Sequence, residues 1–262
     1  MSTFRPEATD YMKVQDGNET KKVLKTEAFE KFNSALLGLG DITETSDSID
    51  AIAAVFDLQG FTNFCKQIQP HLSVPVFLSE FLAWLFDQLR KEMSQKTFEE
   101  GVALWSPLPF YVKFMGDGLL VLWDASSARE AGRRNIIVSC RQICAKYSTD
   151  LYPRLSRKVV DAPPILRCGI ARGAVYSVGN GNDFVGSSIN MAARLEKIPG
   201  ATFAVNARGF KLDDPKATGF FKTTLIVKKM AIRGIGDGEL IALIKSEYEN
   251  MKASDKKHFR DA

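Results

Sequence analysis

The stretch Ala53-Ala54-Val55-Phe56-Asp57-Leu58-Gln59-Gly60-Phe61-Thr62 is an apolar run that ends on an aspartate and a glycine-containing turn. A second stretch, Tyr111-Val112-Lys113-Phe114-Met115-Gly116-Asp117-Gly118, has the same arrangement. Short apolar runs bounded by turn residues are typical of buried strands. Either aspartate alone is as consistent with turn formation as with metal binding. As a pair, Asp57 and Asp117 are candidate ligands for a divalent cation.

A third stretch, from Asp183 to Leu195, begins with a turn and continues as a predicted helix. Asn190 and Arg194 are four residues apart, so a helix presents them on one face. An amide and a guanidinium then lie side by side. This pair changes the interpretation of the two aspartates, because an amide and a guanidinium can contact a substrate beside a cation that the two carboxylates hold.

The composition indicates one globular domain with flanking arms. The chain has 262 residues, of which 45% are hydrophobic and 25% charged, and these are ordinary values for a globular protein. The formal net charge of +4 is too small to argue for a nucleic-acid partner. It is compatible with a local basic pocket for an anionic substrate.

Targeting and cysteine signals favour a cytoplasmic protein. Charged residues interrupt the apolar stretches before the roughly 18 residues that a membrane span needs, and Met1 to Asp10 does not resemble a signal peptide. Cys140 and Cys144 share a helical spacing suited to a metal, but buried thiols are the preferred interpretation. The four cysteines (Cys65, Cys140, Cys144, Cys168) contain no CxxC pair, and the two histidines (His71, His258) give little support to a zinc cluster or a Ser/His/Asp triad.

The pattern along the chain predicts three parts. Residues 1–50 form a polar N-terminal arm with one amphipathic helix that packs on the domain; residues 51–245 form the globular domain, and residues 246–262 a charged tail. Within the domain, the pattern predicts helices near 74–93 and 128–149, a strand over 165–177 and a turn at 179–182. This order predicts an α+β, ferredoxin-like fold, with a mostly antiparallel sheet and flanking helices on one face.

Two carboxylates at one sheet edge suit phosphoryl chemistry. They can hold two divalent cations, Mn²⁺ or Mg²⁺, which neutralise charge on phosphate oxygens. No serine or cysteine nucleophile with an adjacent base stands out, which is acceptable if the substrate supplies its own hydroxyl. An arginine then stabilises the phosphate in the transition state, while an asparagine orients the ribose.

These residues resemble the class III nucleotidyl cyclases, phosphorus-oxygen lyases that convert a nucleoside triphosphate to a 3′,5′-cyclic monophosphate and pyrophosphate. The resemblance covers about residues 52–243 and makes 51–245 the catalytic domain. It implies that Asp57, Asp117 and the Leu58 carbonyl bind the metals, that Gly60, Phe61 and Thr62 cradle phosphates, and that Asn190 and Arg194 act in the transition state. Arg233, in Ile232-Arg233-Gly234-Ile235-Gly236, matches a segment whose lysine usually contacts the triphosphate.

The resemblance also implies a homodimer. In this family the metal-binding motifs and the Asn/Arg helix come from opposite sides of a dimer interface. This chain carries both sets, so a two-fold dimer with two composite sites is expected.

Two features of the sequence point to different nucleotide bases in the substrate. Lys113 and Asp183 match the pair that faces adenine in adenylate cyclases, which favours ATP and cyclic AMP. The wider sequence, including 64–75 and 113–123, resembles the pyrimidine cyclases of the bacterial Pycsar antiphage system, most often makers of cyclic UMP that a separate effector reads. Lys113 could donate to a uracil carbonyl and Asp183 accept from its ring N–H, so the pair does not forbid UTP. We therefore expect UTP ahead of ATP.

Two other classes stay open. A non-catalytic dimerisation module with the cyclase fold predicts no divalent-dependent turnover, although Asp57, Asp117, Asn190 and Arg194 are all present. A polymerase-type nucleotidyl transferase shares the logic of two aspartates on strands. It leaves Asn190 and Arg194 unexplained and needs a nucleic-acid groove that the charge does not support.

Overall fold

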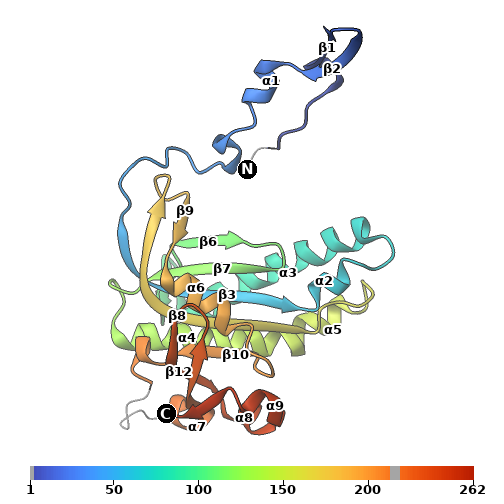
Figure 1. Ribbon diagram of the computed structural model, residues 1–262. Coiled ribbons are helices and arrows are strands. Elements are labelled where there is room, and N and C mark those ends of the chain that lie inside the picture. The colour runs from blue at the N-terminus through green and yellow to red at the C-terminus, as the bar shows by residue number, and fades with distance from the viewer. Residues whose placement is uncertain (1–2, 213–218) are drawn as a thin grey trace. The chain divides into compact units, whose positions relative to one another are not determined.

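The computed structural model describes residues 3–212 and 219–262 (Figure 1). The strands are β1 (Tyr11–Asp16), β2 (Glu19–Leu24), β3 (Ser48–Gln59), β4 (Ser94–Phe98), β5 (Gly101–Leu104), β6 (Tyr111–Phe114), β7 (Gly118–Asp124), β8 (Ile165–Val178), β9 (Asp183–Val185), β10 (Phe203–Asn206), β11 (Leu225–Ile232), β12 (Gly236–Ile244) and β13 (Phe259–Asp261). The α-helices are α1 (Thr26–Glu30), α2 (Phe61–Phe64), α3 (Pro70–Met93), α4 (Glu130–Lys146), α5 (Tyr152–Leu155), α6 (Ser187–Leu195), α7 (Phe220–Thr224), α8 (Lys245–Asn250) and α9 (Ala253–Lys256). Short 3-10 turns are η1 (Ala8–Asp10), η2 (Ser34–Leu37) and η4 (Arg208–Phe210), and η3 (Tyr147–Leu151) is a π-helical turn.

The chain forms two compact units. The smaller contains Met1–Ser48 and Tyr176–Val185, and the larger contains Ile49–Val175 and Gly186–Ala262. The predicted boundaries at residues 50 and 245 stay a prediction.

The main sheet has the strand order β13-β11-β12-β10-β8-β3-β7-β6, and β9 pairs with β8 (Figure 1). Strand β7 is antiparallel to both β3 and β6, and β12 is antiparallel to both β10 and β11. Strand β10 is parallel to β8. These pairings agree with the predicted α+β fold and its mostly antiparallel sheet.

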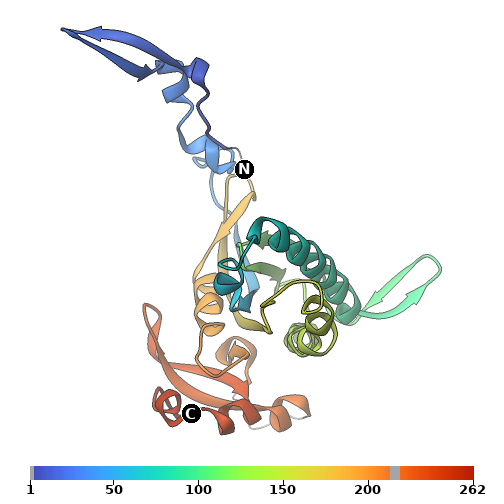
Figure 2. The same ribbon diagram turned by 90° about the vertical axis from the view of Figure 1, so that its right-hand side faces the viewer.

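Strand β3 lies in the middle of this sheet. Its residues Ala51 to Phe56 are all buried, as expected for a strand covered on both faces. Successive side chains of a strand point to opposite faces. The even-numbered residues Ile52, Ala54 and Phe56 join the core that α3 and α4 cover, so Asp57 points to the other face. Figure 2 shows α3 and α4, in teal and yellow-green, on one side of the sheet.

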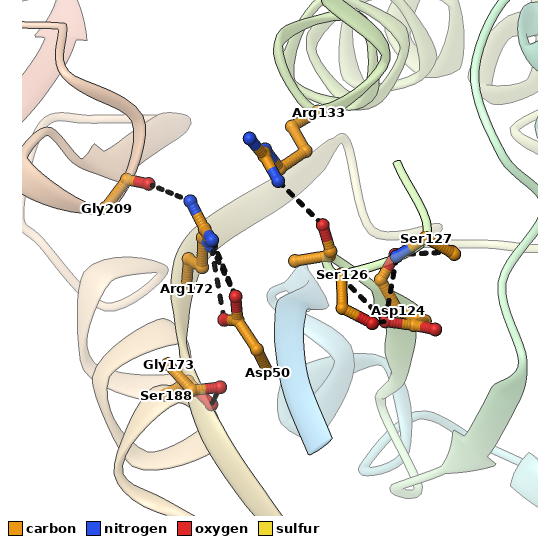
Figure 3. Close-up of polar contacts among 10 residues, drawn as sticks. Asp50, Asp124, Ser126, Ser127, Arg133, Arg172, Gly173, Ser188 and Gly209 are labelled. Carbon is orange, nitrogen blue, oxygen red and sulfur yellow. Dashed lines mark hydrogen bonds and ion pairs between the residues drawn. The ribbon is translucent and has the colours of Figure 1, made fainter. Parts of the chain in front are cut away.

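Helix α6 covers the opposite face. Cys168 of β8 belongs to the core beneath α4, whereas a Cβ on its neighbour Gly169 would lie 2.1 Å from the Ala192 carbonyl oxygen in α6. The first turn of α6 also reaches β8, because the Ser188 hydroxyl donates to the Gly173 carbonyl at 3.4 Å (Figure 3). Flanking helices are confirmed, but the expectation that all lie on one face is wrong.

The predicted elements of the larger unit are present, with shifted ends. Helix α3 begins at Pro70, four residues before the predicted start, and α4 ends at Lys146, before the π-helical turn. The segment predicted as a charged tail forms α8, α9 and β13, and β13 pairs with β11. The buried-thiol interpretation is confirmed, since Cys140 and Cys144 are free thiols in the core.

The N-terminal arm differs from the prediction of one amphipathic helix. The predicted stripe is divided between α1, which has five residues, and η2, while Phe29 and Phe32 are exposed. The unforeseen hairpin β1–β2 precedes it. Within the smaller unit the arm packs on the β8–β9 hairpin. Asp47 and Ser177 exchange two hydrogen bonds, of 2.8 and 3.0 Å, and a Cβ on Gly179 would lie 1.6 Å from the Leu39 carbonyl oxygen.

Helix α3 is the one helix in the described part of the chain that is long and apolar enough, by length and composition, to cross a membrane. Glu80 and Asp87 interrupt its apolar sequence, as expected. Phe77, Phe81 and Leu85 of this helix are buried in the core against the sheet. A core helix passes the same test, so this packing accounts for the apolar sequence.

Candidate active site

Asp57 and Asp117 lie at neighbouring ends of β3 and β7. Asp57 pairs with Gly118 across the two strands, and the Leu58 N–H donates to the Asp117 carbonyl at 3.0 Å. A Cβ on Gly118 would lie 1.8 Å from the Phe56 carbonyl oxygen, so only glycine permits this approach. The main chains of β3 and β7 therefore bring the two predicted metal ligands together.

The Asp57 side chain is held by an arginine that the sequence analysis missed. The Asp57 side chain is 14% exposed, and Arg167 of β8 donates from Nη2 to Asp57 Oδ2 at 2.6 Å. Arg167 has the same parity on β8 as Gly169, so it faces α6. The signal available in the sequence is one arginine inside the run Ile165-Leu166-Arg167-Cys168-Gly169-Ile170, because a charge in a buried strand needs a partner.

A second missed residue, Glu196, completes this group. It directly follows α6, its side chain is 2% exposed, and its Oε2 lies 3.3 Å from Arg167 Nη2. Burial raises the pKa of Glu196 to about 7, and the negative charge of Asp57 adds to this rise, whereas Arg167 and Lys197 oppose it. The Arg167 guanidinium thus lies within ion-pair distance of two carboxylates. We name Asp57, Arg167 and Glu196 the Asp-Arg-Glu cluster.

The predicted phosphate cradle follows β3. Gly60 has φ of +95°, a conformation that favours glycine, and it begins the four-residue helix α2. Gly60 and Thr62 are exposed, while Phe61 is half-buried against the core. Leu58 is buried, and its carbonyl belongs to the same strand end. These residues lie directly beside Asp57 in the chain.

Asn190 and Arg194 lie on one exposed face of α6, as predicted. Arg194 Nη2 lies 3.7 Å from the position that a Cβ would take on Gly234, in the turn between β11 and β12. Arg233 is exposed in this same turn. The structure therefore brings the two predicted phosphate-contacting arginines to adjacent elements.

The structure does not join these groups to the aspartates within one chain. Across residues 3–212 and 219–262, no hydrogen bond or ion pair links Asn190 or Arg194 to Asp57 or Asp117. The predicted base-contacting residues are also on separate elements. Lys113 is half-buried on β6 opposite Leu120, and Asp183 begins β9 in the smaller unit, where its Oδ1 accepts from the Phe184 N–H.

The donor set at the strand ends suits a hard divalent cation. Two carboxylates and one main-chain carbonyl are oxygen ligands, which Mg²⁺ and Mn²⁺ prefer. Asp57 Oδ2 is bonded to Arg167, whereas its Oδ1 has no hydrogen bond or ion pair among the described residues. The described residues contain no group of three or more His, Cys, Asp or Glu side chains placed to hold a metal ion. Main-chain, water or substrate oxygens could supply further ligands.

Comparison with solved structures places this fold among nucleotide cyclases. The chain matches the guanylyl cyclase Cya2 with a TM-score of 0.57 at 16% identity, over 77% of this chain and 94% of that one. It matches the adenylyl cyclase CyaB from P. aeruginosa with a TM-score of 0.57 at 14% identity, over 77% and 96%. A rhodopsin-guanylyl cyclase catalytic core of converted specificity, in complex with ATPalphaS, matches with a TM-score of 0.52 at 16% identity, over 76% and 97%. No protein-family model and no curated protein sequence matches the chain.

These likenesses define the architecture. The chain has the fold of adenylyl and guanylyl cyclase domains, as its motifs predicted. At 14–16% identity the likeness concerns the fold alone.

Proposed function

We propose that this protein is a nucleotidyl cyclase. The observation that carries the proposal is the meeting of Asp57 and Asp117 at neighbouring strand ends, in a domain with the cyclase fold. A fold kept only as a scaffold has no need for two carboxylates at this edge. A nucleotidyl transferase of the polymerase type would not account for Asn190 and Arg194 on the exposed face of α6.

The reaction joins two atoms of one substrate. The ribose 3′-oxygen forms a bond to the α-phosphorus as the bond from that phosphorus to the bridging oxygen breaks; the hydroxyl proton passes to solvent, and pyrophosphate leaves. Asp57, Asp117 and the Leu58 carbonyl would hold the two cations, Mn²⁺ or Mg²⁺, which lower the pKa of the hydroxyl and neutralise phosphate charge. Arg194 stabilises charge on the α-phosphoryl oxygens, and Asn190 orients the ribose. Arg233 and the Gly60–Thr62 segment bind the β- and γ-phosphates.

The substrate we propose is UTP, and the product is cyclic UMP, made by a bacterial antiphage system in the cytoplasm for a separate effector. The support is the likeness of 64–75 and 113–123 to the pyrimidine cyclases. Lys113 donates to a uracil carbonyl, and Asp183 accepts from the ring N–H. ATP is the second candidate, because the same pair suits adenine.

The catalytic unit we propose is a homodimer with two composite sites. The support is that Asn190 and Arg194 are exposed on α6 and make no bond to the aspartates of their own chain in the described residues. The α6 face of one protomer would then complete the aspartate edge of its partner.

The test is incubation of the full chain with Mn²⁺ and each of ATP, GTP, CTP and UTP, with product identification by mass spectrometry. Asp117→Asn removes a metal ligand, so the expected product, cyclic UMP, falls by at least about a hundredfold. The matched control is Asp87→Asn, an exposed aspartate on α3, which is expected to keep full activity. Cyclic AMP as the main product would overturn the choice of base. Absence of every cyclic product would overturn the enzymatic proposal.

A further inference from the structure

A cavity of about 330 Å³ lies in the larger unit, lined by side chains of one dominant charge. Arg133 and Arg134 come from α4, Arg172 from β8, and Arg208 and Lys211 from the segment after β10, while Glu130 is the acidic residue of the lining. Figure 3 shows Arg133 and Arg172 reaching toward this region from α4 and from β8. We name these six residues the arginine pocket.

The arginine pocket is separate from the candidate active site. Arg172 bonds to Asp50, which precedes Asp57 on β3 by seven residues. A strand advances roughly 3.3 Å per residue, so Asp50 and Asp57 are about 23 Å apart along β3. None of the residues assigned to catalysis, metal binding or substrate binding lines the pocket.

The pocket carries a positive charge that its own acids do not cancel. Arg134 pairs with Glu130 at 3.1 Å, and Arg172 pairs with Asp50 at 2.6 Å. Among the described residues, the five basic side chains of the lining and the two acidic side chains Glu130 and Asp50 leave a formal excess of three positive charges. A local excess of this kind attracts anions.

Main-chain carbonyls hold two of the remaining cations without neutralising them. Arg133 Nη1 donates to the Ala125 carbonyl at 2.8 Å, and Arg208 Nη2 donates to the Gly238 carbonyl at 3.3 Å (Figure 3 shows the contact of Arg133). Arg172 likewise donates from Nη1 to the Gly209 carbonyl at 3.4 Å. These contacts fix guanidinium groups in place, and each guanidinium has five N–H donors, so several donors stay available for a ligand.

One donor of the pocket is buried and lacks an acceptor. The Nε atom of Arg134 is shielded from solvent and has no hydrogen-bond partner in the part of the chain that the structure describes. An unpaired buried donor costs free energy. The uncancelled cations of the lining are the feature that favours an anionic occupant.

The size and charge together select the occupant. A cavity at the lower end of the range for ligand sites holds a small molecule. A singly charged carboxylate would cancel only part of the excess, whereas two linked phosphoryl groups carry about three negative charges and present several acceptors to arginine forks. We propose that the arginine pocket binds a pyrophosphate group, either free or as part of a nucleoside diphosphate. This inference does not rest on the proposed cyclase activity.

The test is isothermal titration calorimetry of the full chain in EDTA, with inorganic pyrophosphate in one arm and UDP or ADP in the others. EDTA removes divalent cations, so the metal-dependent site does not contribute and no turnover occurs. We expect one pyrophosphate site per protomer, with affinity reduced at least tenfold in Arg208→Gln/Lys211→Gln. Both replaced residues are exposed, and unfolding midpoints without ligand check that the variant folds. If the double variant does not fold, Arg208→Gln alone is measured instead, and we expect its affinity for pyrophosphate to fall at least threefold.

Two matched variants locate the site. Arg157→Gln removes an exposed arginine outside both sites, and Arg194→Ala removes one from the candidate active site; both are expected to bind pyrophosphate as the wild type does. Loss of binding in Arg194→Ala, unchanged binding in both pocket variants, or no binding at millimolar pyrophosphate would overturn the proposal. Tighter binding of UDP or ADP than of pyrophosphate would identify the source as a nucleotide, and the reverse order would identify it as the free anion.

Discussion

At the scale of single residues, the Asp-Arg-Glu cluster decides how Asp57 is presented. Arg167 is 18% exposed in its side chain and lies between two carboxylates, of which Glu196 is almost fully buried. Its 2.6 Å bond fixes one oxygen of Asp57. The orientation of a proposed metal ligand therefore depends on a residue 110 positions away in the chain.

We expect Arg167→Gln to destabilise the fold. The variant leaves Asp57 and Glu196 close together without their shared cation, and removal of one partner from a buried pair costs about 3 kcal/mol. Urea unfolding at pH 8 measures this loss of unfolding free energy. The control is Arg90→Gln, whose exposed pair with Asp87 on α3 contributes about 0.5 kcal/mol or less. Equal losses in the two variants would show that the cluster does not stabilise the fold.

Glu196 also predicts a pH dependence. Its pKa is raised to about 7 in the folded protein, above the usual value near 4.5 that the unfolded chain has, so the folded state binds the proton more tightly. This contribution to stability is complete below pH 4.5 and is lost as the pH rises through about 7. Glu196→Gln removes the titration, so between pH 4.5 and 8 the variant should gain stability relative to wild type, on the order of 3 kcal/mol.

Urea unfolding of wild type and Glu196→Gln across that pH range measures the difference. Glu99→Gln, an exposed change in the turn between β4 and β5, should show a difference that does not vary with pH. A flat difference for Glu196→Gln as well would contradict the raised pKa.

At the scale of elements, two glycines set the distances between the parts of the site. Gly118 lets β7 lie beside Phe56 of β3, and Gly169 lets α6 lie on β8. The first contact aligns Asp57 with Asp117, and the second places the helix that carries Asn190 and Arg194.

We expect Gly169→Ala to displace α6. The added Cβ would lie 2.1 Å from the Ala192 carbonyl oxygen, which is main chain and cannot turn aside, so the stability should fall by about 1–3 kcal/mol. Thermal unfolding measures this loss. Gly101→Ala in β5, where a Cβ would meet nothing within 4 Å, is the control and should change little. A loss no larger than that of the control would mean that α6 moves on the sheet without cost.

At the scale of the whole molecule, the proposed homodimer rests on two groups of residues that one chain does not join. The aspartates lie at the ends of β3 and β7, and the side chains of Asn190 and Arg194 face outward on α6 without a bond to them in the described residues. A two-fold dimer would unite the halves twice.

We expect inactive variants to complement each other. Asp57→Asn and Arg194→Ala each disable every site of their own homodimer, but a mixed dimer contains one site with neither change. Random exchange makes half of the dimers mixed, so an equimolar mixture should recover about one quarter of the wild-type activity. The measurement is the rate of cyclic nucleotide formation after co-refolding or co-expression. A mixture of Asp57→Asn and Asp117→Asn, both on the same half, is the control; recovery there, or none in the first mixture, would contradict the composite site.

Local sequence patterns were sufficient to predict many elements of this structure. The strands in the apolar runs at 53–56 and 111–114, the helical spacing of Asn190 and Arg194, and the strand from Ile165 all appear as predicted, because period and turn chemistry are properties of neighbouring residues. For the N-terminal arm, the same local patterns gave a wrong prediction of one amphipathic helix. Its apolar stripe is divided between the five-residue helix α1 and the 3-10 turn η2, and Phe29 and Phe32 stay exposed; a short helix whose apolar face is not packed gains little stability.

The sequence by itself determined the class of fold and the identity of the residues proposed for catalysis. Only the tertiary structure decided that Arg167 and Glu196 join Asp57, that α6 covers the face opposite α3 and α4, and that arginines from α4, β8 and the segment after β10 meet in one pocket. The physical reason is that strand pairing and helix packing bring together residues with no local relation in the chain. The ionisation and contacts of those residues depend on burial and on which groups lie nearby in space, and the spacing of residues along the chain does not encode either.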